Sequence, residues 1–114
     1  MKTVVHPAVK DLRLENVLYA LSDPVRLSVV QQLDVNRQMT CGEFSACGSK
    51  GKSTMTHHFK VLRDSGIIHT EIDGREHQTT LRRKELDMRF PGLLDSILRA
   101  ASAQKKSAPS TRTV

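Results

Sequence analysis

Apolar residues recur at helical spacing in two segments near the start of the chain. In residues 11–21 they recur at i, i+3, i+4 and i+7, which predicts a helix with one apolar face. A second helix is expected from Pro24, because Asp23 is a good N-cap residue and proline suits the first helical position. The core face of this second helix is formed by Val25, Val29 and Leu33.

The middle of the chain predicts two further helices joined by a glycine-containing turn. Residues 34–40 are polar and are expected to form a connection, after which a short helix over residues 41–47 would bury Phe44. The next helix is expected over residues 52–64, because Gly66 follows it as a usual helix stop. Its apolar face is formed by Met55, His58, Phe59 and Leu62, and its opposite face by Ser53, His57, Lys60 and Asp64.

The period changes from helical to alternating at residue 68. Alternating side chains, interrupted by Asp73 and Gly74 at a two-residue type I′ turn, predict a β-hairpin that ends near Leu81. The last helix is expected to begin with a short turn near Leu86 and to continue as a main helix from Pro91. These elements form one domain over residues 11–103, between a flexible segment at residues 1–10 and a disordered basic tail at residues 104–114.

The bulk composition restricts the class of protein. The chain has 114 residues, which suits one domain, and it carries a formal net charge of +6 with a pI of about 9.8. This charge indicates a polyanionic partner, and an ordinary solvated basic surface is the alternative. Two cysteines are too few for a disulfide-stapled secreted scaffold. Because Lys10 and Asp11 come too early for a signal-peptide apolar region, and no apolar run has membrane-spanning length, we expect a cytoplasmic protein without membrane contact.

The two expected helices within residues 41–64 have the layout of a helix-turn-helix. A helix that docks in the major groove needs short hydrogen-bonding side chains near its N-terminus and cations that reach phosphates. The second of these helices offers both kinds of side chain, although a plain solvated helix face is the alternative. The hairpin, with Arg75 beside its turn, would form a wing along DNA or would only close the core. The other candidate DNA-binding residues are Lys50, Lys52, Ser53, Thr54, Thr56, His57 and Lys60.

Four stretches of the chain match one family pattern: ALSDPVRLSVVQQL (residues 20–33), STMTHHFKVLRDSGII (53–68), DGRE (73–76) and RFPGLLDSIL (89–98). They resemble the second helix, the recognition helix, the wing tip and the last helix of the ArsR-type winged helix-turn-helix transcriptional regulators. The resemblance covers roughly residues 11–100 and implies a mainly helical fold of four helices, a β-hairpin wing and a final helix. It also implies a homodimer that binds a double-stranded DNA operator of two-fold symmetry and is released by a signal.

The resemblance implies that the first and last helices form the dimer contact. Their apolar surface exceeds what a lone small domain can bury. The alternative is that both helices only complete the core of the monomer. The resemblance also implies that Arg26 supports DNA binding, whereas a local pair with Asp23 is the structural alternative. The candidate dimer residues are Leu14, Leu18, Leu21, Leu93, Leu94, Ile97 and Leu98.

The inducing signal stays open. Metal sensing is not expected, because Cys41 and Cys47 would lie roughly 120° apart around a helix and about 9 Å apart along it, and no histidine follows His77. His69 and His77 are expected on opposite faces of the hairpin. His58 is expected to be a hydrogen-bonded core residue rather than a ligand. A redox role for the two thiols is one hypothesis, since a helix N-terminus favours a thiolate, and two inert buried cysteines is the other.

Two rival classes of function remain for comparison. An enzyme is not expected, because the chain lacks a nucleophile elbow and a zinc-hydrolase motif, and GSKGKST (residues 48–54) lacks the spacer of a phosphate loop. No cofactor is expected. The second rival is a winged-helix module for protein or RNA contacts without operator specificity. The sequence therefore predicts a DNA-binding transcriptional regulator, with this module as the alternative.

Overall fold

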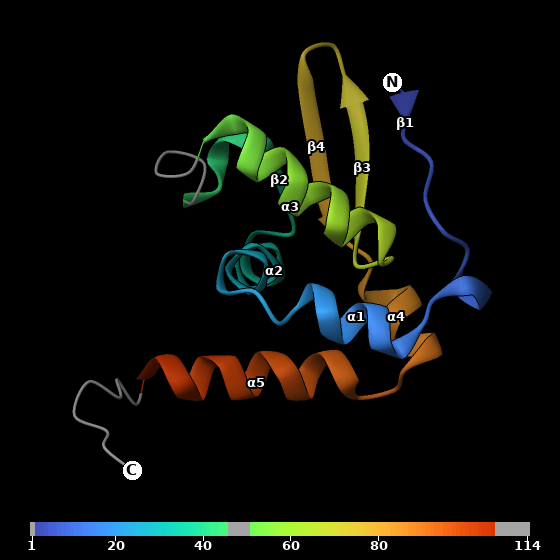
Figure 1. Ribbon diagram of the computed structural model, residues 1–114, viewed down its shortest axis with the longest axis vertical. Helices are drawn as coiled ribbons and strands as arrows, with labels where there is room; N and C mark the ends of the chain where they lie inside the picture. The colour runs from blue at the N-terminus through green and yellow to red at the C-terminus, as the bar shows by residue number, and fades with distance from the viewer. Residues whose placement is uncertain (1, 46–50, 107–114) are drawn as a thin grey trace.

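A computed structural model of the chain describes residues 2–45 and 51–106 (Figure 1). Within these residues, helices surround a small antiparallel sheet whose strand order is β1-β3-β4-β2. The elements, with 3-10 helices labelled η, are β1 (Lys2–Thr3), η1 (Val9–Asp11), α1 (Leu14–Ala20), α2 (Pro24–Asn36), β2 (Gln38–Thr40), η2 (Cys41–Glu43), α3 (Lys52–Asp64), β3 (Ile68–Asp73), β4 (Glu76–Leu81), α4 (Arg83–Arg89) and α5 (Leu93–Lys106).

The elements are arranged so that the hairpin and α5 lie at opposite ends of the molecule. Figure 1 shows the β3–β4 hairpin projecting at one end and α5 lying as a long rod at the other, with α1, α2 and α4 between them. The core joins these parts, because its buried side chains come from α1, α2, α3, β3 and α5. Its largest fully buried side chains are Phe44, Leu12, Leu33, Met55, Leu62, Ile67, Ile68, Val29 and Val30.

The second helix and the helix over residues 52–64 form as the sequence predicts. Asp23 is the N-cap of α2, where one carboxylate oxygen accepts hydrogen bonds from the backbone N–H of Val25 at 2.8 Å and of Arg26 at 3.0 Å. Pro24 occupies the first turn of α2. In α3 the predicted apolar face is buried, with Phe59 half-buried beside Met55, His58 and Leu62.

A strand lies where a polar connection was expected between residues 34 and 40. Helix α2 continues to Asn36, and β2 then pairs antiparallel with β4. One residue, Arg37, reverses the chain between the helix and the strand, with φ of 69°. Such a φ is unfavourable for a residue with a Cβ, and glycine usually occupies such a position at the end of a helix. Because arginine stands here instead, the sequence gives no sign of where the helix ends.

The expected α-helix over residues 41–47 is wrong in its described part. Cys41–Glu43 form the 3-10 helix η2, which begins with a capping box: the Glu43 carboxylate accepts from the Thr40 N–H at 2.7 Å. The predicted burial of Phe44 is confirmed, since 2% of its surface is exposed. Cys47 lies outside the described residues.

The hairpin forms as expected, but its turn is shifted by one residue. Asp73 pairs with Glu76, so Gly74 and Arg75 are the two central residues of the turn. Gly74 has φ of 64°, whereas Arg75 is not among the described residues with positive φ. This is the pattern of a type II′ turn, and the predicted type I′ turn is wrong. His69 and His77 still fall on opposite faces, because the shift moves the pairing by two residues and the period of a strand is two.

The two ends of the chain have more structure than the sequence indicates. Residues 2–7, expected to be flexible, lie along β3 and contact it through β1 and His6. At the other end, α4 is the short turn predicted near Leu86, and the main helix α5 begins at Leu93, two residues after Pro91. Residues 104–106 of the predicted disordered tail are helical, and the rest of that tail lies outside the described residues.

Candidate nucleic-acid interface

The outer face of α3 is a row of exposed polar side chains. These side chains lie opposite Met55 and Leu62, which are 2% and 0% exposed and anchor the helix to the core. Gly51 is the N-cap and offers no side chain to the first backbone N–H groups, so these groups remain available to an anion. The predicted contact residues that are exposed here are Lys52, Ser53, Thr54, Thr56, His57 and Lys60. Lys50 lies outside the described residues.

One cation of this face has an intramolecular partner. The Lys60 ammonium lies 2.7 Å from the Asp64 carboxylate, one helical turn further along α3. Both side chains are more than half exposed, so this i,i+4 pair contributes little to stability. Phosphate can therefore compete for Lys60 at small cost to the fold.

The hairpin places one cation at its tip. Arg75 is exposed as the second central residue of the turn, between the exposed carboxylates of Asp73 and Glu76. In Figure 1 the tip and the N-terminal half of α3 lie toward the same end of the molecule, away from α5. The helix and the hairpin can therefore meet one ligand together.

Arg26 does not lie on this surface. It is 6% exposed, and its guanidinium donates to the carbonyl of Ala20 at 2.7 Å and to that of Tyr19 at 3.4 Å. Its Nη1 lies 3.2 Å from Nδ1 of His58, and its cationic carbon lies 5.2 Å from the centre of the Tyr19 ring. The side chain thus joins α1 to α3 from within α2. The expected side-chain pair with Asp23 is not among its described hydrogen bonds, and its burial leaves little surface for a direct DNA contact.

Asp23 completes the polar cluster beneath α3. Its carboxylate lies 3.9 Å from Nδ1 of His58, which is 8% exposed and is thus the buried, hydrogen-bonded histidine that the sequence predicts. Burial opposes ionisation of Asp23, but hydrogen bonds from the Arg26 and Val25 N–H groups and the charges of His58 and Arg26 outweigh it. The pKa of the carboxyl is therefore held below 3.8. This cluster fixes α3 to α2 through charged and polar groups.

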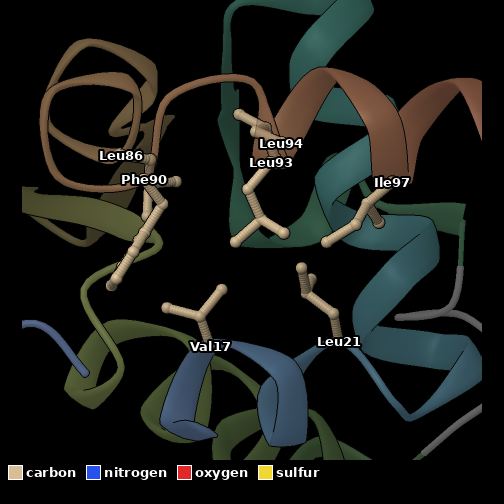
Figure 2. A pocket seen from close by; sticks show the side chains of 7 residues that line it. All are labelled: Val17, Leu21, Leu86, Phe90, Leu93, Leu94 and Ile97. Atoms are coloured by element: carbon tan, nitrogen blue, oxygen red, sulfur yellow. The ribbon is translucent and has the colours of Figure 1, made fainter. Parts of the chain in front are cut away.

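The predicted dimer residues divide into two sets. Leu21, Leu94 and Leu98 are 8%, 3% and 9% exposed in the single chain, where they complete its core. Figure 2 shows Val17 of α1 and Leu21, the residue just after this helix, pointing toward α5 across a space too narrow for a water molecule. Because the single chain already buries Leu21, Leu94 and Leu98, they offer a partner little surface.

The second set keeps apolar surface outside the core. Leu14 and Leu18 on α1 are 44% and 47% exposed, while Leu93 and Ile97 on α5 are half-buried. Besides Val5 and Val35, which are 89% and 77% exposed, two apolar side chains that sequence reasoning did not place on a surface are exposed in the described residues: Tyr19 at 62% and Met88 at 65%. Tyr19 falls outside the i, i+3, i+4 stripe of α1, and Met88 lies in the short helix α4, so periodicity assigns neither of them to a surface.

The described residues contain no group of three or more histidine, cysteine, aspartate or glutamate side chains placed to hold a metal ion. Cys41 is half-buried at the start of η2. In the part of the chain that the structure describes, no helix is both long and apolar enough to cross a membrane.

An exposed polar helix beside a projecting hairpin is the arrangement of a winged helix-turn-helix DNA-binding protein. Residues 21–71 match the family model described as a helix-turn-helix domain. The HTH-type transcriptional regulator YceK of Bacillus subtilis is 33% identical to this chain over 82 residues, which cover 71% of this chain and 82% of that protein. The chain belongs to the ArsR family of helix-turn-helix transcriptional regulators. This non-enzymatic family agrees with the expectation that the chain is not an enzyme.

Further relatives extend the similarity in sequence and fold. The arsenical resistance operon repressor of Staphylococcus xylosus is 33% identical over 79 residues, which cover 65% of this chain and 70% of that protein. The transcriptional repressor BigR of Xylella fastidiosa is 25% identical with a TM-score of 0.58, covering 83% of this chain and 85% of that one. The crystal structure of an ArsR family regulator matches this chain with a TM-score of 0.59 and 21% identity. The match covers 96% of this chain and the whole of that regulator's chain. The predicted winged helix fold is confirmed.

Proposed function

We propose that this chain is a dimeric cytoplasmic repressor that binds an inverted-repeat DNA operator through α3 and the wing. The observation that carries the proposal is the two-sidedness of α3, whose buried face fixes it to the core while its outer face is wholly polar and exposed. Such a helix matches the requirements for reading base edges in the major groove. Two relatives named as repressors, one of an arsenical resistance operon and one from Xylella fastidiosa, support repression.

The residues of the interface take different roles in this proposal. Ser53, Thr54, Thr56 and His57 read base edges, because short polar side chains near a helix N-terminus reach the floor of the groove. Lys50, Lys52 and Lys60 bind phosphates, and Arg75 contacts the backbone or the minor groove from the wing tip. Arg26 acts only through the position of α3, since its side chain lies beneath that helix.

The proposed dimer uses the apolar surface of α1 and α5. Leu14, Leu18, Leu93 and Ile97 remain partly uncovered in the single chain. Because this surface lies away from the hairpin, a two-fold dimer formed here leaves both copies of α3 free to face one side of a duplex. The two half-sites would then be about 34–36 Å apart, one turn of B-DNA.

The signal that releases the protein is proposed to be thiol oxidation. Cys41 begins η2, which lies just before the segment that leads into α3, so a change at this thiol can move the recognition helix. The oxidant would be a peroxide, whose O–O bond breaks as it takes two electrons and two protons from the thiols of Cys41 and Cys47, which join as a disulfide. Two inert cysteines is the alternative.

Binding to a labelled fragment from upstream of the gene, compared with a scrambled duplex, tests the proposal. Intact protein should bind the upstream fragment at nanomolar concentration, with an affinity that falls steeply as salt rises. The double variant Thr56→Ala, His57→Ala should lose discrimination between the two duplexes while weak binding to both survives. The matched control Ser102→Ala, Gln104→Ala changes exposed residues of α5 and should behave as the parent. Equal affinity of the parent for scrambled DNA or for RNA would instead favour a module without operator specificity.

A further inference from the structure

The N-terminal segment gives the wing a third strand near its tip. Strand β1 pairs antiparallel with β3, with Lys2 opposite Ile72 and Thr3 opposite Glu71. On the other edge, β2 pairs with Gln78–Thr80 of β4, further from the turn. Because Gln78 lies opposite Glu71, β2 ends at the level of Thr3, and in the described residues only β1 continues beside the hairpin to Ile72, one residue nearer the turn. An unsupported two-stranded ribbon is marginally stable in water, so this third strand stiffens the tip.

An imidazole takes the place of a backbone carbonyl in this third-strand pairing. The carbonyl of Thr70 accepts from the Val4 N–H at 3.4 Å, as in an ordinary ladder. The Thr70 N–H, however, donates to Nε2 of His6 at 3.0 Å. Because Nε2 accepts this hydrogen bond, the ring must be neutral, with its proton on Nδ1. Protonation at Nε2 would place a second N–H donor opposite the Thr70 N–H, so this hydrogen bond would be lost.

The surroundings of His6 also disfavour a positive charge. Its ring stacks on that of His69 with 4.3 Å between ring centres and 18° between planes. Arg82, which is 8% exposed, donates to the carbonyl of Pro7 at 2.9 Å, and Arg63 of α3 adds a second cation. Glu71 shares the face of β3 with His69, and Glu85 lies 3.9 Å from the Arg82 guanidinium.

These contacts lower the pKa of His6 below 6.5. Burial is the largest cause, followed by the charges of His69, Arg82 and Arg63, while a hydrogen bond with the Val4 backbone acts in the opposite direction. A depressed pKa means that the attached segment binds the neutral ring better than the charged ring. Attachment is thus strongest above pH 6.5 and is lost as the pH falls through the pKa of the attached state.

We propose that residues 2–7 are a detachable third strand of the wing, held by neutral His6 and released when that ring is protonated. Release leaves the part of the hairpin beyond Glu71 and Gln78 as a two-stranded ribbon and frees the outer edge of β3. The consequence for DNA rests on the proposed function, because a loosened wing tip orders at greater entropic cost when it meets the duplex.

Amide exchange of Thr70 tests the attachment without DNA. The protection factor of this amide, referred to amides in the β3–β4 ladder, should be constant near pH 7.5 and fall by at most about tenfold per pH unit toward pH 5.5, since one proton is taken up. His6→Gln keeps an acceptor that does not titrate, so its protection should not change over this range. His77→Gln removes the exposed histidine on the opposite face of the hairpin and should behave as the parent.

His69→Gln separates the contribution of the stacked ring. Removing this neighbour should reduce the total fall in Thr70 protection between pH 7.5 and 5.5, because His6 then loses one cause of its low pKa and protonation costs the attached state less. Protection in the parent that is constant from pH 7.5 to 5.5, or the same slope in His6→Gln, would overturn the proposal.

Operator affinity over the same pH range provides the second readout. The parent should lose affinity relative to His6→Gln as the pH falls, and protonation of His57 on α3 cancels because both proteins carry it. If the parent shows no sequence-specific binding, the proposed function fails while the amide exchange still decides the attachment. If specific binding is present and the two proteins have the same pH dependence, the link from the third strand to DNA is wrong.

Discussion

Nη1 of Arg26 lies 3.2 Å from Nδ1 of His58, so that one buried guanidinium joins α2 to the inner face of α3. The same guanidinium donates to the carbonyl groups of Ala20 and Tyr19 at the end of α1. Three helices thus meet on one charged side chain that is 6% exposed. The position of α3 depends on a buried polar contact as well as on apolar packing.

Arg26→Met should destabilise the protein by about 1–3 kcal/mol, because the charge-assisted hydrogen bond to the buried Ala20 carbonyl is lost. Urea unfolding followed by circular dichroism measures the change. The control is Arg75→Met at the exposed wing tip, which should change the unfolding free energy by less than about 0.5 kcal/mol. Equal stability of Arg26→Met and the parent would contradict this role.

Asp23→Ala should cost about 1 kcal/mol near pH 7, because two N–H groups of the first turn of α2 lose their acceptor. The pKa of Asp23 is lowered below 3.8, so its charged form contributes stability above that pH and the contribution is lost as the pH falls through the folded-state pKa. The difference between parent and variant in urea unfolding should therefore shrink between pH 5 and pH 2.

Asp23→Asn is the matched control for this titration. Its amide oxygen still caps α2 but does not titrate, so its stability near pH 7 should exceed that of Asp23→Ala. A difference between the parent and Asp23→Ala that does not change with pH would show that the charge of this carboxylate contributes nothing.

Gly66→Ala should destabilise the protein by about 2 kcal/mol or more. Gly66 has φ of 84°, and a Cβ added there would lie 2.0 Å from Cδ2 of Leu12, a side chain that is 2% exposed. Gly42→Ala is the control, because a Cβ there meets nothing within 4 Å and the backbone has no positive φ. Thermal unfolding of the two variants should differ clearly, and similar midpoints would show that the chain between α3 and β3 relaxes freely.

Leu14→Ser combined with Leu18→Ser should weaken the proposed dimer more than tenfold. Both side chains are nearly half exposed in the single chain, and a two-fold contact would bury four of them. A loss of about 1.4 kcal/mol in association free energy is already tenfold in the dissociation constant. Sedimentation across a concentration series measures the change. Val35→Ser, at a residue of α2 that is 77% exposed, is the control. An unchanged association constant would remove this surface from the dimer.

Where periodicity and capping agree, the sequence is sufficient to predict the element. Helix α3 has the predicted bounds, since its apolar positions repeat every three or four residues and glycines lie just outside both ends. The exposed face of α3 follows from the same periodicity. The burial of His58 could also be predicted, because it shares the apolar face of the helix with Met55 and Leu62 and therefore faces the core.

The remaining differences come from contacts that are remote in the sequence. Strand β2 forms because β4, which comes much later in the chain, offers it a free edge, and no local signal at Arg37 marks the reversal. The attachment of His6 to Thr70 likewise joins the start of the chain to a strand in its second half. The burial of Arg26 could not be predicted, because two of its partners are backbone carbonyls, which composition and spacing cannot indicate.

The turn of the hairpin separates the shape of the wing tip from its charge. Gly74 alone takes the positive φ, so it is the position that resists substitution. Arg75 has a backbone conformation that any L-amino acid adopts, and its side chain is exposed. Evolution can therefore replace the cation at the tip with a neutral or acidic group at almost no folding cost. Relatives with this turn are free to adjust how strongly the hairpin is attracted to a polyanion without altering its backbone.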